Sequence, residues 1–262
     1  MKHKYHHLLG KLKPYIICHP NTLSALNKDY MGMTVHADHI YNPLLTKDFD
    51  FINRIIKMDE LSFGPGGMGM PRWVLFDCAL IPGAVIGFGI PANQLTSADQ
   101  ALLKVVGDDF VPLSMYIAIP NADGKSWFGH NLSSLNGILK EDLKGLGLLT
   151  KYYALGVLKI EKLIGATQWD SAALGLHLKL SPMKLLASHV SIHTHENTLC
   201  YESFNFYPEE QVLGDQRPLQ IKTKEFTSDL VGIKNLQKRI EAGEEIILIS
   251  KDSKQSVFHL QS

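Results

Sequence analysis

The chain has 262 residues, of which 45% are apolar and 20% charged, so it can bury a sizeable core and is not expected to be disordered. Basic and acidic residues number 26 each, which removes the basic excess typical of nucleic-acid binding. No apolar run reaches the roughly 18 residues that a membrane span needs, and the basic N-terminus lacks the sustained apolar core of a signal peptide. Three scattered cysteines without CxxC spacing favour a reducing compartment. We therefore expect a cytoplasmic protein that binds neither nucleic acid nor membranes.

The first hundred residues predict a strand, a helix and a hairpin in succession. Alternating apolar and polar residues in 33–40 predict a strand, and apolar residues at turn spacing in 46–63 predict a helix. The glycine-rich run 63–71 breaks that helix and is either an anion-binding loop or a flexible connector. Two apolar runs separated by a Pro-Gly turn in 73–90 predict a β-hairpin, and a short capped helix is expected over 97–106.

The middle of the chain contains the best candidate for a central strand and a long insertion after it. Residues 111–120 are almost continuously apolar, as expected for a buried strand. Residues 121–141 are polar and aromatic, and connections of that length are usually functional or structured. The Trp-Phe pair at 127–128 is either a lid over a pocket or an anchor that holds the insertion. After it, Gly145 and Gly147 open a long apolar helix pattern.

The second half of the chain alternates short strands and helices. We expect a strand at 164–167, a helix capped by Asp170, strands at 184–195 and 198–206, a helix at 230–240 and a closing hairpin at 246–260. This order predicts an α/β or α+β fold with a mixed central sheet and helices on both of its faces.

The glycine doublet is the clearest candidate for a binding motif. Backbone amides of Leu146 and Leu148, next to Gly145 and Gly147, can bind a pyrophosphate at the start of a helix, and Lys144 can add positive charge. The alternative is a pair of glycines that only begin a buried helix. Neither GxxxxGK[ST] nor GxGxxG occurs here, so the pattern does not predict a P-loop or a dinucleotide site.

The surrounding sequence resembles the GNAT acyltransferase superfamily, the acyl-CoA N-acyltransferase fold. Its members bind acyl-CoA on a Q/R-x-x-G-x-G/A loop that follows a central strand and opens a helix. Gly145 and Gly147 match the two glycines, whereas Asp142 stands where Gln or Arg is expected. The family continues with a strand and a short helix of the form N-x-x-A-x-x-hydrophobic-Tyr, similar to the run from Asp170 to His177. The hairpin predicted upstream resembles the family's antiparallel strand pair.

The resemblance implies three regions. A GNAT-like domain over 32–206 contains the insertion 121–141, which is longer than the family pattern. An N-terminal extension (1–31) precedes this domain, and a C-terminal helix-plus-hairpin extension (207–262) follows it. The C-terminal extension is expected to complete the sheet, cover one of its edges or mediate a homodimer.

The resemblance also implies an activity, the transfer of an acyl group from acetyl-CoA or another acyl-CoA to an amine of a small molecule or peptide. The expected cofactor-binding residues are Lys144, Gly145, Leu146, Gly147 and Leu148 at the pyrophosphate. A backbone amide of the strand around Ile117 and Ile119 is expected to bind the oxyanion. His177, in place of the family's tyrosine, is expected to protonate the departing thiolate.

A general base for the acceptor amine has two candidates, Asp77 on the predicted hairpin and His130 in the insertion. Each can instead be an ordinary surface residue.

Two other functions remain open. His189, His193 and His195 share one face of a predicted strand and, with Asp77 or Glu202, are candidate ligands for zinc or iron, although we assign no metal site. The third hypothesis is a non-catalytic protein with a GNAT-like fold that binds a ligand or partner.

Overall fold

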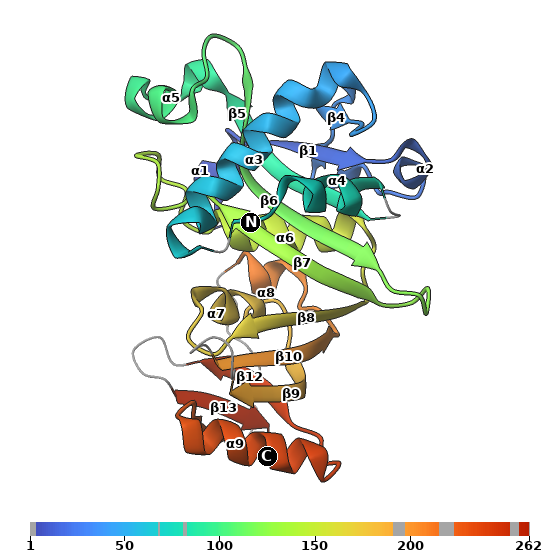
Figure 1. Ribbon diagram of the computed structural model, residues 1–262, viewed down its shortest axis with the longest axis vertical. Helices are drawn as coiled ribbons and strands as arrows, with labels where there is room; N and C mark the ends of the chain where they lie inside the picture. Colours follow the sequence, from blue (N-terminus) through green and yellow to red (C-terminus); the bar gives the residue numbers. More distant parts are fainter. Residues whose placement is uncertain are drawn as a thin grey trace. The chain divides into compact units, whose positions relative to one another are not determined.

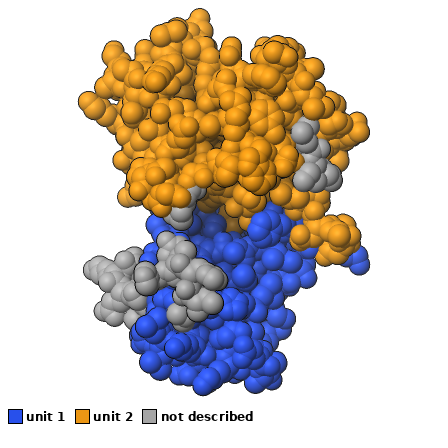
Figure 2. All heavy atoms as spheres, viewed as in Figure 1, with its two compact units in different colours: residues 1–4, 125–128, 161–262 blue, residues 5–124, 129–160 orange. Residues whose placement is uncertain are grey.

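The computed structural model describes residues 4–67, 69–80, 83–190, 197–214, 223–251 and 257–261. The chain divides into two compact units, coloured separately in Figure 2. Unit 1 comprises residues 1–4, 125–128 and 161–262, and unit 2 comprises residues 5–124 and 129–160. Within the described ranges, no helix is long and apolar enough to span a bilayer.

Unit 2 is built on a mixed sheet. Its strands are β1 (Lys13–Cys18), β4 (Ile40–Tyr41), β5 (Ala84–Pro91), β6 (Phe110–Pro120) and β7 (Trp127–Ser134), of which β7 belongs to this unit from residue 129. They lie in the order β4-β1-β5-β6-β7, with β4 parallel to β1 and with β5 antiparallel to both β1 and β6. Residues 111–118 of β6 are all buried, which explains why the run shows no polar alternation. β2 (Asp29–Tyr30) and β3 (Met33–Thr34) form a separate small hairpin.

Helices cover both faces of this sheet. In Figure 1, α3 (Phe49–Phe63) and α4 (Arg72–Leu80) lie in front of the strands and α6 (Leu146–Val157) lies behind them. α3 buries Phe51, Ile52, Ile55 and Met58, a spacing that places one apolar stripe against the sheet. The other helices described in this unit are α1 (His6–Leu9), α2 (Pro20–Leu23) and α5 (Ser97–Leu103). The predicted mixed sheet with helices on both faces is confirmed.

Unit 1 contains strands whose described pairs are antiparallel. Its strands are β8 (Lys162–Gln168), β9 (Met183–Val190), β10 (Asn197–Phe204), β11 (Thr223–Thr227), β12 (Ile247–Lys251) and β13 (Val257–Gln261), in the order β11-β13-β12-β9-β10-β8. Its described helices are α7 (Ala172–Leu178), α8 (Glu209–Val212) and α9 (Leu230–Glu241).

The C-terminal segment shares its hydrophobic core with the rest of unit 1. Ile233 and Leu236 of α9 and Phe258 of β13 are buried in the same cluster as Trp169 and Tyr201. The segment therefore completes a sheet, which is the first of the three roles expected for it. The unit boundary at residue 160 differs from the boundaries 32–206 and 207–262 that we predicted from the sequence.

The hairpin predicted over 73–90 is wrong in its first arm, because residues 72–80 form the helix α4. The antiparallel partner of β5 is β6. Leu75, Cys78 and Ala79 are buried, at the spacing of a helix face rather than of a strand. A nine-residue apolar run is compatible with either structure, and only the buried positions distinguish the two.

Several strands lie where none was expected from the sequence, among them β7 and β1. The insertion 121–141 contains β7, so its Trp-Phe pair at 127–128 begins a strand and is half-buried. The N-terminal extension contains β1, which lies inside the unit 2 sheet between β4 and β5. Residues 1–31 therefore contribute to the central sheet instead of forming a separate extension.

Candidate functional site

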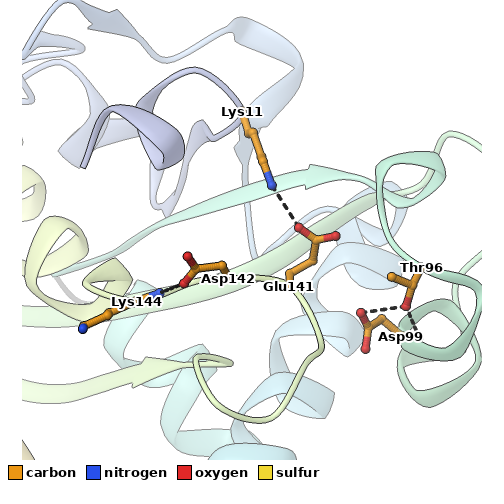
Figure 3. A network of polar contacts seen from close by, with 6 residues as sticks. All are labelled: Lys11, Thr96, Asp99, Glu141, Asp142 and Lys144. Atoms are coloured by element: carbon orange, nitrogen blue, oxygen red, sulfur yellow. Dashed lines mark hydrogen bonds and ion pairs between the residues drawn. The ribbon is translucent and has the colours of Figure 1, made fainter. Parts of the chain in front are cut away.

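The loop between β7 and α6 is held in place along its length. It buries three leucines, Leu135, Leu139 and Leu143. Asp99 of α5, itself buried, accepts a hydrogen bond from the backbone N–H of Lys140 at 3.2 Å. Lys11 donates to Glu141 at 2.9 Å, a contact drawn in Figure 3. These contacts order the loop before any ligand binds.

Gly145 ends this loop in a conformation that favours glycine. Its φ of 92° lies in the left-handed region, and a Cβ atom built there would lie 2.1 Å from Cε1 of Tyr5. Among the described residues, no side chain caps α6 at this position. The amide of Leu146, one of the two expected anion donors, already donates to the carbonyl oxygen of Leu143 at 2.9 Å, so that expectation is wrong for Leu146. The amides of Gly147 and Leu148 have no intrahelical acceptors and lie at the positive end of the helix dipole. This arrangement can bind an anion.

Asp142, which stands where the GNAT pattern has Gln or Arg, shapes the loop. Its Oδ1 accepts a hydrogen bond from the backbone N–H of Lys144 at 3.2 Å (Figure 3), a local contact that acidic side chains often make in turns. Lys140 and Lys144 balance Glu141 and Asp142 in formal charge. Positive potential at this loop therefore comes from backbone amides more than from an excess of lysine.

α6 is fixed to the sheet by buried polar contacts. The hydroxyl of Thr150 donates to the carbonyl oxygen of Leu146 at 2.8 Å and hydrogen-bonds with the hydroxyl of Ser114 on β6 at 2.6 Å, and Tyr15 of β1 donates to the carbonyl oxygen of Ser114 at 2.8 Å. Lys151 is only 2% exposed, and its Nζ lies 5.5 Å from the centroid of the Tyr116 ring. Burial lowers the pKa of Lys151 to about 7.

Ile117 and Ile119, the expected oxyanion-binding positions, belong to a different strand from the one that precedes the loop. They lie on β6, which has β5 on one side and β7 on the other. Ile117 pairs with Val85 in the β5–β6 ladder, so its backbone is already committed to the sheet. The strand that leads into the glycine doublet is β7, and the role expected for Ile117 and Ile119 stays a prediction.

A second polar cluster connects α3, β7 and the glycine-rich loop. Asp59 of α3 is 1% exposed and accepts hydrogen bonds from the N–H of Met70 at 2.6 Å and from Nδ2 of Asn131 at 3.1 Å. One turn further along α3, Ser62 bonds to Ser133 of β7 at 2.8 Å. Sequence analysis missed Asp59, because the periodic pattern of α3 gives no reason to bury a carboxylate on its apolar side.

The two candidates for the general base lie on different elements of unit 2. His130 is on β7, and burial lowers the pKa of its imidazole while the charge of Asp59 raises it by less. Asp77 is on α4 rather than on a hairpin, and its side chain is exposed.

His177 belongs to unit 1 and is buried on α7. Its ring lies 5.6 Å from the ring of Tyr201 on β10, measured between centroids, with an angle of 36° between the planes. Ser171, one residue after the predicted Asp170, caps this helix by accepting from the amide of Ala173. The expected role of His177 as an acid stays a prediction.

The histidines of the metal hypothesis fall partly outside the described residues. His189 is exposed on β9, whereas His193 and His195 lie beyond the described part of the chain. Glu202 forms an ion pair with Lys162 at 2.7 Å. Within the described ranges, no group of three His, Cys, Asp or Glu side chains is placed to hold a metal ion.

No protein-family model matches the sequence, and no curated protein sequence gives a significant match. Solved structures do match. The ribosomal-protein-S18-alanine N-acetyltransferase from Escherichia coli aligns with a TM-score of 0.42 and 9% identity, over 68% of this chain and 96% of its own. An aminoglycoside 6'-acetyltransferase type Ii aligns with a TM-score of 0.42 and 10% identity, over 60% and 91%. A Desulfovibrio desulfuricans protein assigned to the GNAT family of acetyltransferases aligns with a TM-score of 0.38 and 9% identity, over 61% and 93%.

The chain is structurally similar to acetyltransferases. Its elements follow the order that the sequence resemblance implies, namely strand β7, the glycine loop, helix α6, strand β8 and helix α7. β5 and β6 form the antiparallel pair upstream of this series.

Proposed function

We propose that this protein transfers an acyl group from acetyl-CoA or a related acyl-CoA to an amine of a small molecule or peptide. The observation that carries the proposal is the glycine-led N-terminus of α6, which follows a loop held by three buried leucines and by Asp99. Amides at such a terminus form an anion site, and the pyrophosphate of CoA is an anion that fits it. Because the loop is already ordered, little conformational entropy is lost on binding.

The chemistry proposed for the reaction is direct attack. The amine nitrogen attacks the thioester carbonyl carbon, a C–N bond forms, and the C–S bond breaks as the tetrahedral intermediate collapses. His130 takes the proton from the amine, a role that suits an imidazole whose pKa is lowered by partial burial. The departing thiolate takes a proton from the solvent or from an acid of the protein and leaves as free CoA thiol. Asp77 is the second candidate for the base.

Binding is tested by titrating the protein with acetyl-CoA in a calorimeter and by measuring the thermal shift that the ligand causes. Gly147→Asp places a carboxylate at the start of α6 and is expected to weaken binding by about tenfold or more, which corresponds to about 1.4 kcal/mol. Gly64→Asp is the matched control, since a Cβ atom at Gly64 meets nothing within 4 Å. Unchanged affinity in Gly147→Asp would remove the proposed cofactor site.

Turnover is tested separately by following the release of free CoA thiol with a panel of small amines and peptides. His130→Gln, Asp77→Asn and His177→Phe separate the candidate roles, because loss of the base lowers kcat/KM most above the pKa of that base, where its proton-accepting form predominates, and removes the acid limb that the base causes. A protein that binds acetyl-CoA yet releases no thiol with any amine would favour the non-catalytic hypothesis.

A further inference from the structure

Asp59 carries a carboxylate on the buried side of α3, where acidic side chains are uncommon. It is 1% exposed, and carboxylates are almost never buried this fully unless they are paired or hydrogen-bonded. Burial raises the pKa of Asp59, and the hydrogen bonds from Met70 and Asn131 oppose that change. A residue that costs free energy to bury is expected to contribute something other than packing.

The two hydrogen bonds of Asp59 connect three segments. Oδ2 accepts from the backbone N–H of Met70, which ends the glycine-rich run that leads to α4. Oδ1 accepts from the side chain of Asn131 on β7. Since His130 is the residue before Asn131, one carboxylate fixes the strand that carries the candidate base and the loop on the other side of α3.

Charge adds a second connection to His130. The carboxylate of Asp59 raises the pKa of the imidazole, and the imidazole lowers the pKa of Asp59 in return. Glu60, the next residue of α3, is the other charged group that acts on Asp59, and it raises the pKa of that carboxyl.

We propose that Asp59 is a positioning residue for His130. It acts through its hydrogen bonds to Asn131 and to the loop at Met70, which hold the strand that carries His130, and through its own negative charge. The catalytic part of this inference rests on the proposed function, because His130 is taken there as the general base. Asp59 itself takes no proton from the substrate. Its hydrogen bonds keep β7 in place while the imidazole accepts the proton from the amine.

The test measures the pKa of His130 directly, by NMR titration of the histidine ring signals of the full chain, with His130→Gln identifying the signal. Asp59→Asn removes the charge at nearly constant volume, so the pKa of His130 is expected to fall by roughly half a pH unit or more. Ser62→Ala is the matched control, because it removes the neighbouring contact between α3 and β7 without changing any charge. An Asp59→Asn variant in which His130 titrates as in the wild type would overturn the proposal.

The rate measurement uses the same variants. Because the active form of the base is the neutral imidazole, a lower pKa moves the acid limb of kcat/KM to lower pH by the same amount, and Ser62→Ala leaves that limb in place. Asp59→Glu keeps the charge but changes the reach of the carboxylate, so it provides a second variant if Asp59→Asn does not fold. It is expected to keep the titration of His130 near that of the wild type and to lower kcat/KM, and an unchanged kcat/KM would contradict the positioning role.

The outcomes distinguish this inference from the proposed function. If no amine is acylated but Asp59→Asn still shifts the titration of His130, the proposed function fails and the coupling between the two residues stands. If acylation occurs and neither the titration nor the acid limb moves in Asp59→Asn, the function stands and the inference fails.

Discussion

The buried ammonium group of Lys151 predicts that the stability of this protein rises with pH above neutrality. The folded chain lowers the pKa of Lys151 from 10.5 to about 7, with burial as the cause. Between these two values the unfolded chain binds a proton at this side chain and the folded chain does not. The free energy of unfolding therefore increases with pH in that window, by about 1.4 kcal/mol per pH unit at most.

The whole window corresponds to at most about 5 kcal/mol, which is large against the 5–15 kcal/mol that typically stabilises a domain. Lys151→Met keeps the length of the side chain and removes the titration. We expect this variant to be more stable than the wild type at pH 7 and the two proteins to converge as the pH approaches 10.5. Below about pH 7 the wild-type lysine is charged in both states, so the difference between the proteins becomes constant there.

The assay is urea unfolding of both proteins at several values between pH 6 and pH 10, analysed as the difference between variant and wild type so that other titrating groups cancel. Lys234→Met, at an exposed position of α9, is the control and is expected to change stability by less than about 0.5 kcal/mol at every pH. A difference between Lys151→Met and the wild type that stays the same from pH 7 to pH 10 would refute the reasoning.

Three further variants test the packing of α6 and its loop. Gly156→Ala would place a Cβ atom 2.2 Å from Cζ of Tyr30, so we expect a loss of about 1–3 kcal/mol in urea unfolding, relieved when Tyr30→Ala is added. Thr150→Val removes the buried hydrogen bond to Ser114 and is expected to lower the free energy of unfolding by about 1–3 kcal/mol in the same assay. An unchanged free energy of unfolding would show that the 2.6 Å contact does not stabilise the protein. Asp99→Ala removes the hydrogen bond to the amide of Lys140 in the loop before α6. We expect calorimetry to show that acetyl-CoA binds about tenfold more weakly, a change of about 1.4 kcal/mol. An unaltered affinity would mean that the order of this loop does not contribute to binding.

Much of the element order could be predicted from local pattern. The apolar run 111–120, the glycine doublet before α6 and the hairpin of β12 with β13 all have sequence signals that agree with their tertiary environment. Three helix starts agree closely with the sequence signals, since Thr96, Ser171 and Asp229 cap α5, α7 and α9 close to the expected ends of these helices, whereas α3 begins at Phe49, three residues after the predicted start.

One incorrect prediction concerns a short apolar run that is compatible with either a helix or a strand. Residues 72–80 form α4 because Leu75, Cys78 and Ala79 can be buried together only on a helix, and periodicity over nine residues does not determine that. β7 could not be predicted because its half-buried strand mixes polar and apolar side chains.

The fold class, the helix that begins at the glycine doublet and the family resemblance can be predicted from the sequence alone, because glycine conformation, helix capping and hydrophobic period depend on a few neighbouring residues. The surroundings of Asp59, Lys151 and His130 depend on the tertiary structure. Asp59 and Asn131 are 72 positions apart in the chain, and their hydrogen bond exists only once α3 packs against β7. Burial and charge–charge interaction depend on distances in space, so the pKa values and the positioning role of such groups follow from the folded chain alone.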